Sequence, residues 1–460
     1  MNEGTTGAGP SEVETPTVPA SPSLLTDVPH GTESGSTPQR ALITHVLVIA
    51  CVVVFASMAL RQLSSAHPSS EQLLLRWGAN FGPLTLAGQW WRLLTSVFIH
   101  LGLLHLAVNM WCLWDLGSFA ERIYGRATFL MIYLMSGVAG AMCSILWRPF
   151  AVEAGASGAI FGLAGALIAS FFFGHLPFPR TSAKAALLGV IAFTAYNLFA
   201  GLFSKATGNA AHLGGLVSGF LLGLLIARTS LRKTLAVGAL SILLGCGLLA
   251  ETKGYVVPAE RGRTALAAGH SDQSILALSE SLQKNPKFAE GYALLGQAYL
   301  QKQQLAAAEA AYRHVLQLEP NASDVRYQLG LAVVAQGRAD EALAIFRELA
   351  RSNPKNPEGQ MGIGTAAELM GNYQLAMEAF RRATEIDPRN PQAYNNLGLA
   401  ALQAHHNDEA VSAFSKGVQL QPNNPDSLMH LALAYKANGM EKEAEETYRR
   451  ALQASQAKPK

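Results

Sequence analysis

The distribution of apolar and polar residues divides the chain into three parts. Residues 1–39 contain few large apolar side chains, residues 41–250 are apolar with short polar breaks, and residues 258–460 are polar, alanine-rich and periodic. A helix needs about 20 predominantly apolar residues to cross a bilayer. The middle part therefore predicts a polytopic membrane helix bundle, with candidate spans at 41–61, 91–117, 128–147, 156–175, 184–203, 210–228 and 234–250.

The segment between the first two spans, 62–90, is too polar to cross a bilayer and contains Trp77 and Trp90. Tryptophan favours the membrane–water boundary, so this segment is predicted to be a long interfacial loop. The distribution of arginine and lysine between the loops favours a cytoplasmic N-terminus. Seven spans would then place residues 251–460 outside the cytoplasm, whereas six, without 234–250, would place them inside.

The last part repeats with a period of 34 residues, marked by prolines at positions 286, 320, 354, 388 and 422. Glycine follows an aliphatic residue in one register, and an alanine stands four residues before an aromatic in another. This pattern resembles the tetratricopeptide repeat (TPR), in which each unit is a helix–turn–helix. It predicts an α-solenoid of five repeats over 289–460, preceded by a linker and a degenerate capping repeat over 253–288. Such solenoids present a concave face to peptides or partner proteins.

Composition supports this division. Only 15% of the residues are charged, against about 25% in soluble chains. The net charge of +3 is small and no basic block is present, so a nucleic-acid partner is not expected. The four cysteines lie in apolar stretches without metal-ligand spacing, so neither a metal site nor a cofactor is predicted. The glycine-, serine- and proline-rich residues 1–39 are predicted to be a disordered tail.

Five polar residues stand out inside the predicted spans. His100, His105 and Asn109 lie in the second span, Ser157 opens the fourth, and His212 lies near the start of the sixth. Polar and ionisable residues are costly inside a membrane and are functional candidates by default. On the predicted topology all five lie in the outer half of the bundle, although they are far apart in sequence.

These residue types suggest nucleophilic catalysis. A serine hydroxyl needs an adjacent base to take its proton, and imidazole is the usual base because it titrates near neutral pH. Aspartate and glutamate are absent from the fourth and sixth spans, so Ser157 and His212 are predicted to form a dyad without an acid. His105, Asn109 and the backbone N–H of Ser157 could donate to the developing oxyanion.

Small residues recur at a spacing of four in the same two spans, a pattern that lets membrane helices approach closely. The two stripes are Gly158, Gly162 and Ala166 in one span and Ala211, Gly215 and Gly219 in the other. Close approach of these helices is expected to bring the serine hydroxyl within hydrogen-bonding reach of the imidazole.

Four motifs, WRLLTSVFIHLGLLHLAVNM, ERIYG, GASGAIFG and AHLGGLVSG, occur in this order within residues 91–220. Together they resemble the rhomboid family of intramembrane serine proteases, over roughly 41–228. The resemblance implies a six-helix core with Ser157 as nucleophile and His212 as general base. It also implies that His105 and Asn109 donate to the oxyanion, and that His100 has a supporting role.

The resemblance extends to the loops, with two departures. Trp91 and Arg92 match a pair that structures the first loop of the family. Phe161 stands where some members have tyrosine, and it can stack on His212 without donating a hydrogen bond. At Glu121 the family's Glu-x-Arg reads Glu-Arg-Ile, which moves the arginine out of register.

The resemblance implies a serine endopeptidase that cleaves transmembrane protein substrates near the outer bilayer face, in contact with lipid and assisted by the TPR array. The alternative is a catalytically silent membrane scaffold that recruits partners through the array. A multi-pass protein of the plasma (inner) membrane is expected, with a cytoplasmic N-terminus and an extracytoplasmic array. The expected parts are the tail 1–39, the protease domain 40–230, a seventh transmembrane helix 231–252, the linker and cap 253–288, and the repeats 289–460.

Overall fold

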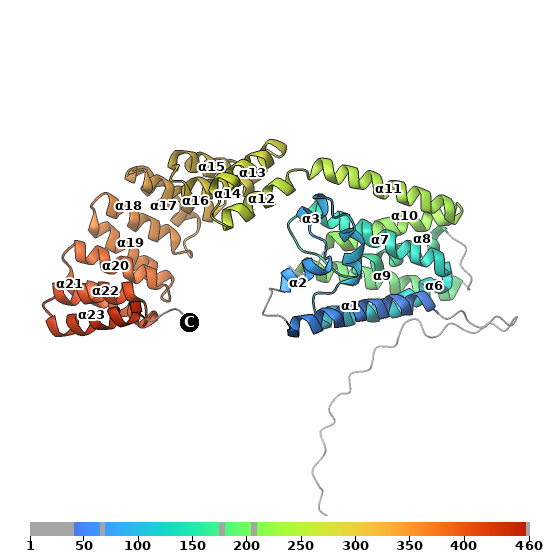
Figure 1. Cartoon of the computed structure of the whole chain (residues 1–460), viewed down its shortest axis with the longest axis horizontal. Helices are drawn as coiled ribbons and strands as arrows, with labels where there is room; N and C mark the ends of the chain where they lie inside the picture. Colours follow the sequence, from blue (N-terminus) through green and yellow to red (C-terminus); the bar gives the residue numbers. More distant parts are fainter. Residues whose placement is uncertain (1–40, 65–69, 174–179, 204–208, 457–460) are drawn as a thin grey trace, which may run out of the picture. The chain divides into compact units, whose positions relative to one another are not determined.

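The computed structural model describes residues 41–64, 70–173, 180–203 and 209–456. Within them the chain is helical, apart from one isolated antiparallel bridge between Asn80 and Glu153. The chain divides into two compact units, Met1–Lys253 and Gly254–Lys460 (Figure 1). The predicted all-α class, a membrane bundle followed by a helical solenoid, is confirmed, whereas the predicted tail 1–39 lies outside the described residues.

Among its described residues, the first unit has six long helices and several short ones. The long helices are α1 (Leu42–Ser64), α7 (Arg126–Trp147), α8 (Ser157–Phe173), α9 (Arg180–Phe203), α10 (Asn209–Ile226) and α11 (Leu231–Thr252). The short elements are α2 (Ser70–Trp77), α3 (Gly82–Leu86), α4 (Arg92–Thr95), the 3₁₀ turn η1 (Ser96–Phe98), α5 (Leu103–Cys112), the π-helical turn η2 (Leu113–Gly117) and α6 (Ser118–Tyr124).

The described residues of the seven predicted spans are mostly helical, but the helices differ in how well they fit a membrane. Within the described residues, four helices are long and apolar enough to cross a bilayer: Leu42–Arg61, Arg126–Trp147, Asn209–Ile226 and Leu231–Thr252. A fifth qualifies if the bent pair Arg92–Phe98 and Leu103–Tyr124 is one span. The apolar stretches Ser157–Phe173 and Ala185–Phe199 are shorter.

The predicted boundaries of the second span, 91–117, are wrong. The chain bends by 92° between Phe98 and Leu103, and the long helical run then continues to Tyr124 through α5, η2 and α6. His100 therefore lies in the bend and not on the helix that carries His105. The predicted interfacial loop 62–90 also contains two short helices, α2 and α3.

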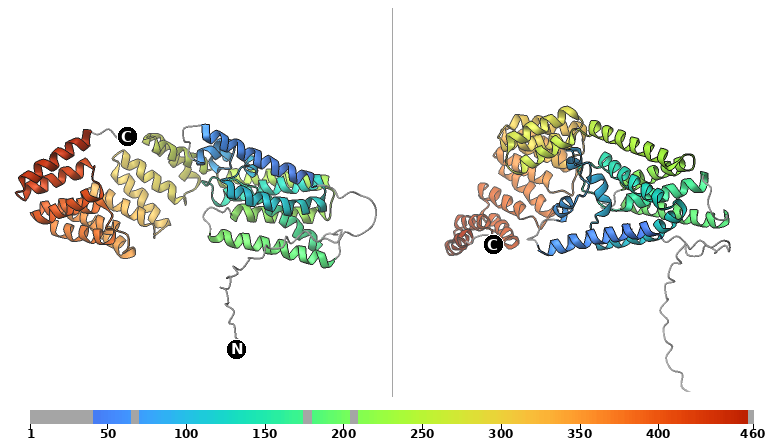
Figure 2. Two further views of the ribbon diagram at one scale, coloured as in Figure 1. Left: turned by 90° about the horizontal axis from the view of Figure 1, so that it is seen from below. Right: turned by 45° about the vertical axis from the view of Figure 1, so that its right-hand side comes forward.

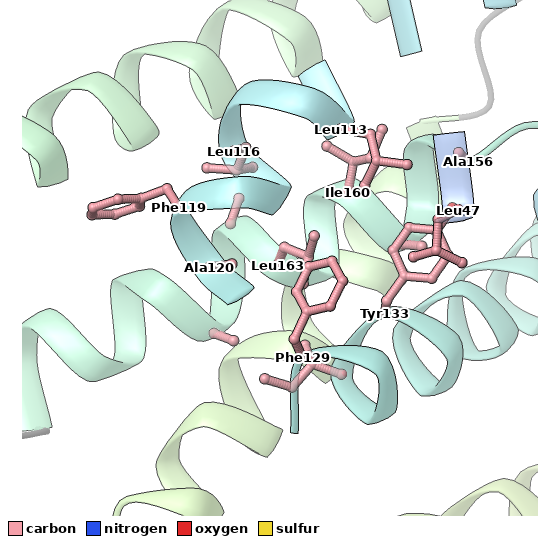
Figure 3. Close-up of a cluster of buried hydrophobic side chains, with 14 of the residues drawn as sticks. Leu47, Leu113, Leu116, Phe119, Ala120, Phe129, Tyr133, Ala156, Ile160 and Leu163 are labelled. Carbon is pink, nitrogen blue, oxygen red and sulfur yellow. The ribbon is translucent and has the colours of Figure 1, made fainter. Parts of the chain in front are cut away.

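Helix α8 forms the centre of the membrane unit. Every residue from Gly158 to Leu167 is buried, as expected for a helix that is apolar on all sides. It packs against α7 and α10, and its side chains Ile160 and Leu163 meet residues of α1, η2, α6 and α7 in one apolar cluster (Figure 3). The nucleophile candidate thus opens the most enclosed helix of the bundle.

Glu121, in the middle of α6, connects the second helical run to the start of α1. Its carboxylate is buried and accepts hydrogen bonds from the backbone N–H groups of Ile43 (3.0 Å) and Thr44 (2.8 Å) and from the Thr44 hydroxyl (2.8 Å). The first N–H groups of a helix have no partner within the helix, and a negative charge there is favourable. Glu121 thus caps α1.

Glu121→Gln is expected to lower the free energy of unfolding of the membrane unit by about 2–3 kcal/mol, because hydrogen bonds to a charged acceptor are each worth about 1.5–3 kcal/mol. Thermal unfolding in detergent micelles would measure this loss as a lower Tm. Glu71→Gln, at an exposed glutamate on α2, is the matched control and should leave Tm unchanged. An equal Tm for the two variants would contradict the capping role.

The second unit consists of helices that follow one another in antiparallel pairs (Figure 2). It begins with the pair α12 (Val256–Ala267) and α13 (Ser271–Lys284). The next pairs are α14 (Ala289–Gln301) with α15 (Leu305–Leu318), α16 (Ser323–Ala335) with α17 (Ala339–Ser352), α18 (Glu358–Leu369) with α19 (Tyr373–Ile386), α20 (Pro391–Gln403) with α21 (Asn407–Leu420), and α22 (Pro425–Ala437) with α23 (Glu441–Gln456).

The repeated glycines and aromatics meet inside each pair. A Cβ added to these glycines would lie 2.4–2.7 Å from an aromatic ring of the second helix, in the pairs Gly296 with Tyr312, Gly330 with Phe346, Gly364 with Phe380 and Gly398 with Phe414. Each ring is fully buried. In each pair, the aromatic ring of the second helix packs directly against the backbone of the glycine in the first helix. This contact fixes how the two helices of a repeat are aligned, in agreement with the 34-residue period.

Candidate functional site

The hydroxyl of Ser157 and the imidazole of His212 meet between α8 and α10. The distance between Ser157 Oγ and His212 Nε2 is 2.9 Å, within hydrogen-bonding range. Ser157 is the first residue of α8 and is half-buried, whereas His212 lies one turn into α10 and is buried. The sequence predicted these two side chains to pair, and the structure brings them together.

The glycine stripes explain this approach. A Cβ on Gly215 would lie 1.9 Å from the carbonyl oxygen of Gly158, and one on Gly219 would lie 1.9 Å from that of Gly162. A real Cβ does not approach another atom this closely, so only glycine fits at these two positions. The backbones of α8 and α10 are therefore in direct contact here. One turn further along, Gly223 continues the contact against Ala166.

Phe161 supports the histidine. Its ring lies parallel to the imidazole of His212, with 4.3 Å between the ring centroids and 3° between the planes. Phe161 is buried and also contacts Phe193 of α9 at 5.9 Å between centroids. The stacking restricts the rotation of the imidazole and leaves its Nε2 directed at Ser157.

His105 and Asn109 lie one turn apart on α5. The position of a Cβ on Gly155 would be 2.9 Å from His105 Cε1 and 3.2 Å from His105 Nε2, so the imidazole borders the backbone just before Ser157. Asn109 is buried, and its Nδ2 donates to the carbonyl of His105 at 2.8 Å. The second Nδ2 hydrogen is available to another acceptor.

His100, in the bend before α5, also reaches this backbone. It is buried, the N–H of Ala156 points to its Nε2 at 3.5 Å, and its ring lies 5.3 Å from that of His105. His100 thus contacts the segment before Ser157 and has no contact with the hydroxyl itself among the described interactions. Its placement suits a structural role.

The loop before Ser157 is held by backbone contacts from the first part of the unit. The N–H of Gly155 donates to the carbonyl of Ser96 (2.9 Å), and Asn80 and Glu153 exchange two backbone hydrogen bonds (2.9 and 2.8 Å). Gly155 adopts φ +144°, which side-chain-bearing residues rarely adopt. Neither Gly155 nor Asn80 was among the residues predicted from the sequence. The GASG motif, which begins with Gly155, is the signal that could have indicated the glycine.

Arg92 fixes the first loop. Its guanidinium is buried and donates to the carbonyls of Leu75 (2.8 Å) and Ala79 (3.0 Å), and it lies 4.7 Å from the ring of Trp91. Satisfying two backbone carbonyls at once holds the chain immediately before Asn80. The Trp91–Arg92 pair thus orders the loop that supports the approach to Ser157.

Comparison with known proteins identifies both parts of the chain. Residues 87–229 match the family model described as Rhomboid domain, and residues 229–460 match that of the cilia and flagella-associated protein 70 C-terminal domain, a TPR family. Among solved structures, YrrB, described as a TPR protein with an unusual peptide-binding site, is 22% identical, and the match covers 39% of this chain and 92% of YrrB with a TM-score of 0.31.

Two rhomboid proteases are similar in sequence to the membrane unit. Rhomboid protease GluP of Bacillus subtilis is 39% identical over 152 residues, which cover 33% of this chain and 29% of GluP. Rhomboid protease AarA of Providencia stuartii is 33% identical over 201 residues, which cover 39% of this chain and 71% of AarA. The chain thus spans less than a third of the length of GluP and more than two thirds of that of AarA. It belongs to the rhomboid family and combines a rhomboid membrane domain with a C-terminal TPR array.

Proposed function

We propose that this protein is an intramembrane serine endopeptidase, with Ser157 as nucleophile and His212 as general base. The observation that carries the proposal is the 2.9 Å contact between Ser157 Oγ and His212 Nε2, with the imidazole stacked on Phe161. Neighbouring nucleophile and base side chains, with the base held in orientation by a third group, are typical of covalent catalysis. The proposed domain is 40–230, followed by a seventh transmembrane helix over 231–252.

The proposed reaction uses the two side chains in turn. His212 Nε2 takes the proton of Ser157 as Oγ attacks the carbonyl carbon of the scissile peptide bond, and it then donates this proton to the leaving amine. Water attacks the resulting ester with the help of the same base and regenerates the serine. The cycle requires neither a metal nor a cofactor.

The negative charge that develops on the substrate carbonyl would be stabilised by donors around Ser157. The backbone N–H groups at the start of α8 have no partner within the helix, and the helix dipole favours an anion there. His105, which borders Gly155, and the second Nδ2 hydrogen of Asn109 supply further candidates. One such donor is worth about 10²–10³-fold in rate.

The membrane setting suggests the substrate class. Helix α8 has 17 residues, which corresponds to about 25 Å of helix, less than the roughly 30 Å of a hydrocarbon core. Ser157, at its end, would therefore lie below the surface of the bilayer but within reach of water. We infer that the substrates are transmembrane proteins whose helices are unstable enough to unwind near the outer bilayer face, and that the TPR array binds peptides or proteins.

Purified protein offered a generic, unstable transmembrane substrate tests the proposal. We expect cleavage together with covalent labelling of Ser157 by a serine-directed fluorophosphonate, and loss of labelling in His212→Ala. The alternative, a catalytically silent membrane scaffold with a TPR array, predicts neither cleavage nor labelling. Cleavage that persisted in Ser157→Ala would refute the proposed nucleophile.

Phe161→Ala is expected to lower kcat about 3- to 10-fold, because an aromatic pair contributes about 0.5–1.5 kcal/mol that would otherwise hold the imidazole in place. Steady-state cleavage of the same substrate measures the change. Phe172→Ala, at an exposed ring on the same helix, is the control and should cleave at the wild-type rate. Equal rates for the two variants would show that stacking on His212 does not orient the base.

The side of the membrane that holds the array can be measured with reporters fused after residue 460. Seven spans and a cytoplasmic N-terminus predict that alkaline phosphatase at this position is active and that green fluorescent protein is dark. The plasma (inner) membrane is the proposed location. A fluorescent and phosphatase-inactive C-terminus would place the array in the cytoplasm and contradict the proposed extracytoplasmic location.

A further inference from the structure

The second ring nitrogen of His212 has no partner in the part of the chain that the structure describes. Nε2 lies 2.9 Å from Ser157 Oγ, whereas Nδ1 is buried and has no hydrogen-bond partner among the described residues. For Nε2 to accept the serine proton, Nδ1 must carry the hydrogen of the neutral ring. The active tautomer therefore has a buried N–H that requires an acceptor.

A candidate acceptor for this hydrogen lies one turn earlier on the same helix. Asn209 is the first residue of α10, three positions before His212, so the two side chains are neighbours on one helix face. Its Nδ2 donates to the carbonyl of Leu198 on α9 (3.3 Å), whereas its Oδ1 is buried and has no partner among the described residues. The donor and the acceptor complement each other.

We propose that Asn209 is a positioning residue for the general base: its Oδ1 accepts a hydrogen bond from His212 Nδ1–H, directly or through one water molecule. This inference rests on the proposed protease function. The hydrogen on a ring nitrogen is set by the hydrogen bond at the other nitrogen, so this contact would select the tautomer that leaves Nε2 free for the Ser157 proton. The amide supplies an acceptor without placing an ionised carboxylate inside the membrane, where it would be costly.

The contact also defines a step in the cycle. When His212 takes the Ser157 proton on Nε2, both ring nitrogens carry hydrogens, and the positive ring remains bound to Asn209 Oδ1 through Nδ1. The proton then leaves Nε2 for the amine product, and Nδ1 keeps its hydrogen throughout. The Nδ2 donation to Leu198 anchors the amide to α9 and fixes the direction of its oxygen.

The test measures the rate at which a fluorophosphonate labels Ser157 in the full-length protein in detergent, as a function of pH. Asn209→Ala is expected to lower this rate about 10- to 100-fold, the value of one hydrogen bond to a charged group. Asn209→Asp is expected to remain active, with the acid limb of its pH profile moved to higher pH, because a carboxylate favours the protonated ring. Asn197→Ala, which removes a half-buried asparagine of α9 whose Nδ2 donates to the carbonyl of Phe193, should match the wild type.

A second readout does not depend on activity. ¹⁵N NMR of histidine-labelled protein, with the His212 signals assigned by their loss in His212→Ala, should show Nδ1 protonated in the wild type and a mixture of tautomers in Asn209→Ala. Wild-type labelling rates and pH profiles in both Asn209 variants, or an unchanged tautomer in Asn209→Ala, would overturn the proposal. Absence of labelling in the wild type would refute the protease function itself, and the NMR signals would still decide the role of Asn209.

Discussion

Ser157→Ala is expected to reduce cleavage of a transmembrane substrate by about 10⁴-fold or more, because removing the nucleophile of a serine–histidine pair costs about that much or more in serine proteases. The substitution removes only the hydroxyl oxygen that lies 2.9 Å from His212 Nε2. The bundle should therefore remain folded, and an unchanged Tm would confirm this. The rate is measured by gel-based cleavage in proteoliposomes.

The partner substitution sharpens this test, because groups that act as one unit are strongly non-additive. His212→Ala should cost nearly as much as Ser157→Ala, and the double variant should be no slower than the slower single variant. Ser218→Ala, at a serine of α10 whose hydroxyl donates to the carbonyl of Gly215, is the control and should retain activity. Multiplicative losses in the double variant would indicate that the two side chains act separately.

Gly219→Ala is expected to lower the free energy of unfolding by about 2–3 kcal/mol, the cost of overpacking a close contact. The added Cβ would lie 1.9 Å from the carbonyl oxygen of Gly162, so α8 and α10 must separate. Because Ser157 and His212 lie on these two helices, cleavage should also fall about 100-fold, as it does when a reacting group is misplaced by about 1 Å.

The matched control is Gly247→Ala on α11, where an added Cβ meets no atom within 4 Å. Alanine is favoured over glycine in helices by about 1 kcal/mol, so this variant should be as stable as the wild type or more stable. Thermal unfolding and cleavage, measured side by side for the two variants, separate the effect of the contact from that of helix propensity. A Gly219→Ala protein as stable as Gly247→Ala would contradict backbone contact between α8 and α10.

The fold was predictable where it depends on local pattern. The 34-residue period predicts the register of the array, because each repeat packs only on its neighbours, and the aromatics at Tyr312, Phe346 and Phe414 lie where that register expects them. The apolar stretches predict the membrane helices because a helix needs about 20 predominantly apolar residues to cross a bilayer. The bend at residues 99–102 was missed, since apolar composition continues across it and hydropathy carries no information on chain direction.

The residue types that could perform the chemistry were determined by the sequence alone: a serine, histidines and an asparagine in apolar segments, with glycine stripes that predict close helices. Only the tertiary structure decided which of these atoms meet. Three features depend on neighbouring chain segments and side-chain conformations: the contact of Ser157 with His212, the stacking of Phe161 and the cap that Glu121 places on α1. The same holds for Asn209 Oδ1, which has no partner among the described residues. The physical reason is that periodicity shows only which face of a helix is apolar. A hydrogen bond requires the donor and acceptor to be placed to within a few tenths of an ångström, and only the packing of the whole fold determines this placement.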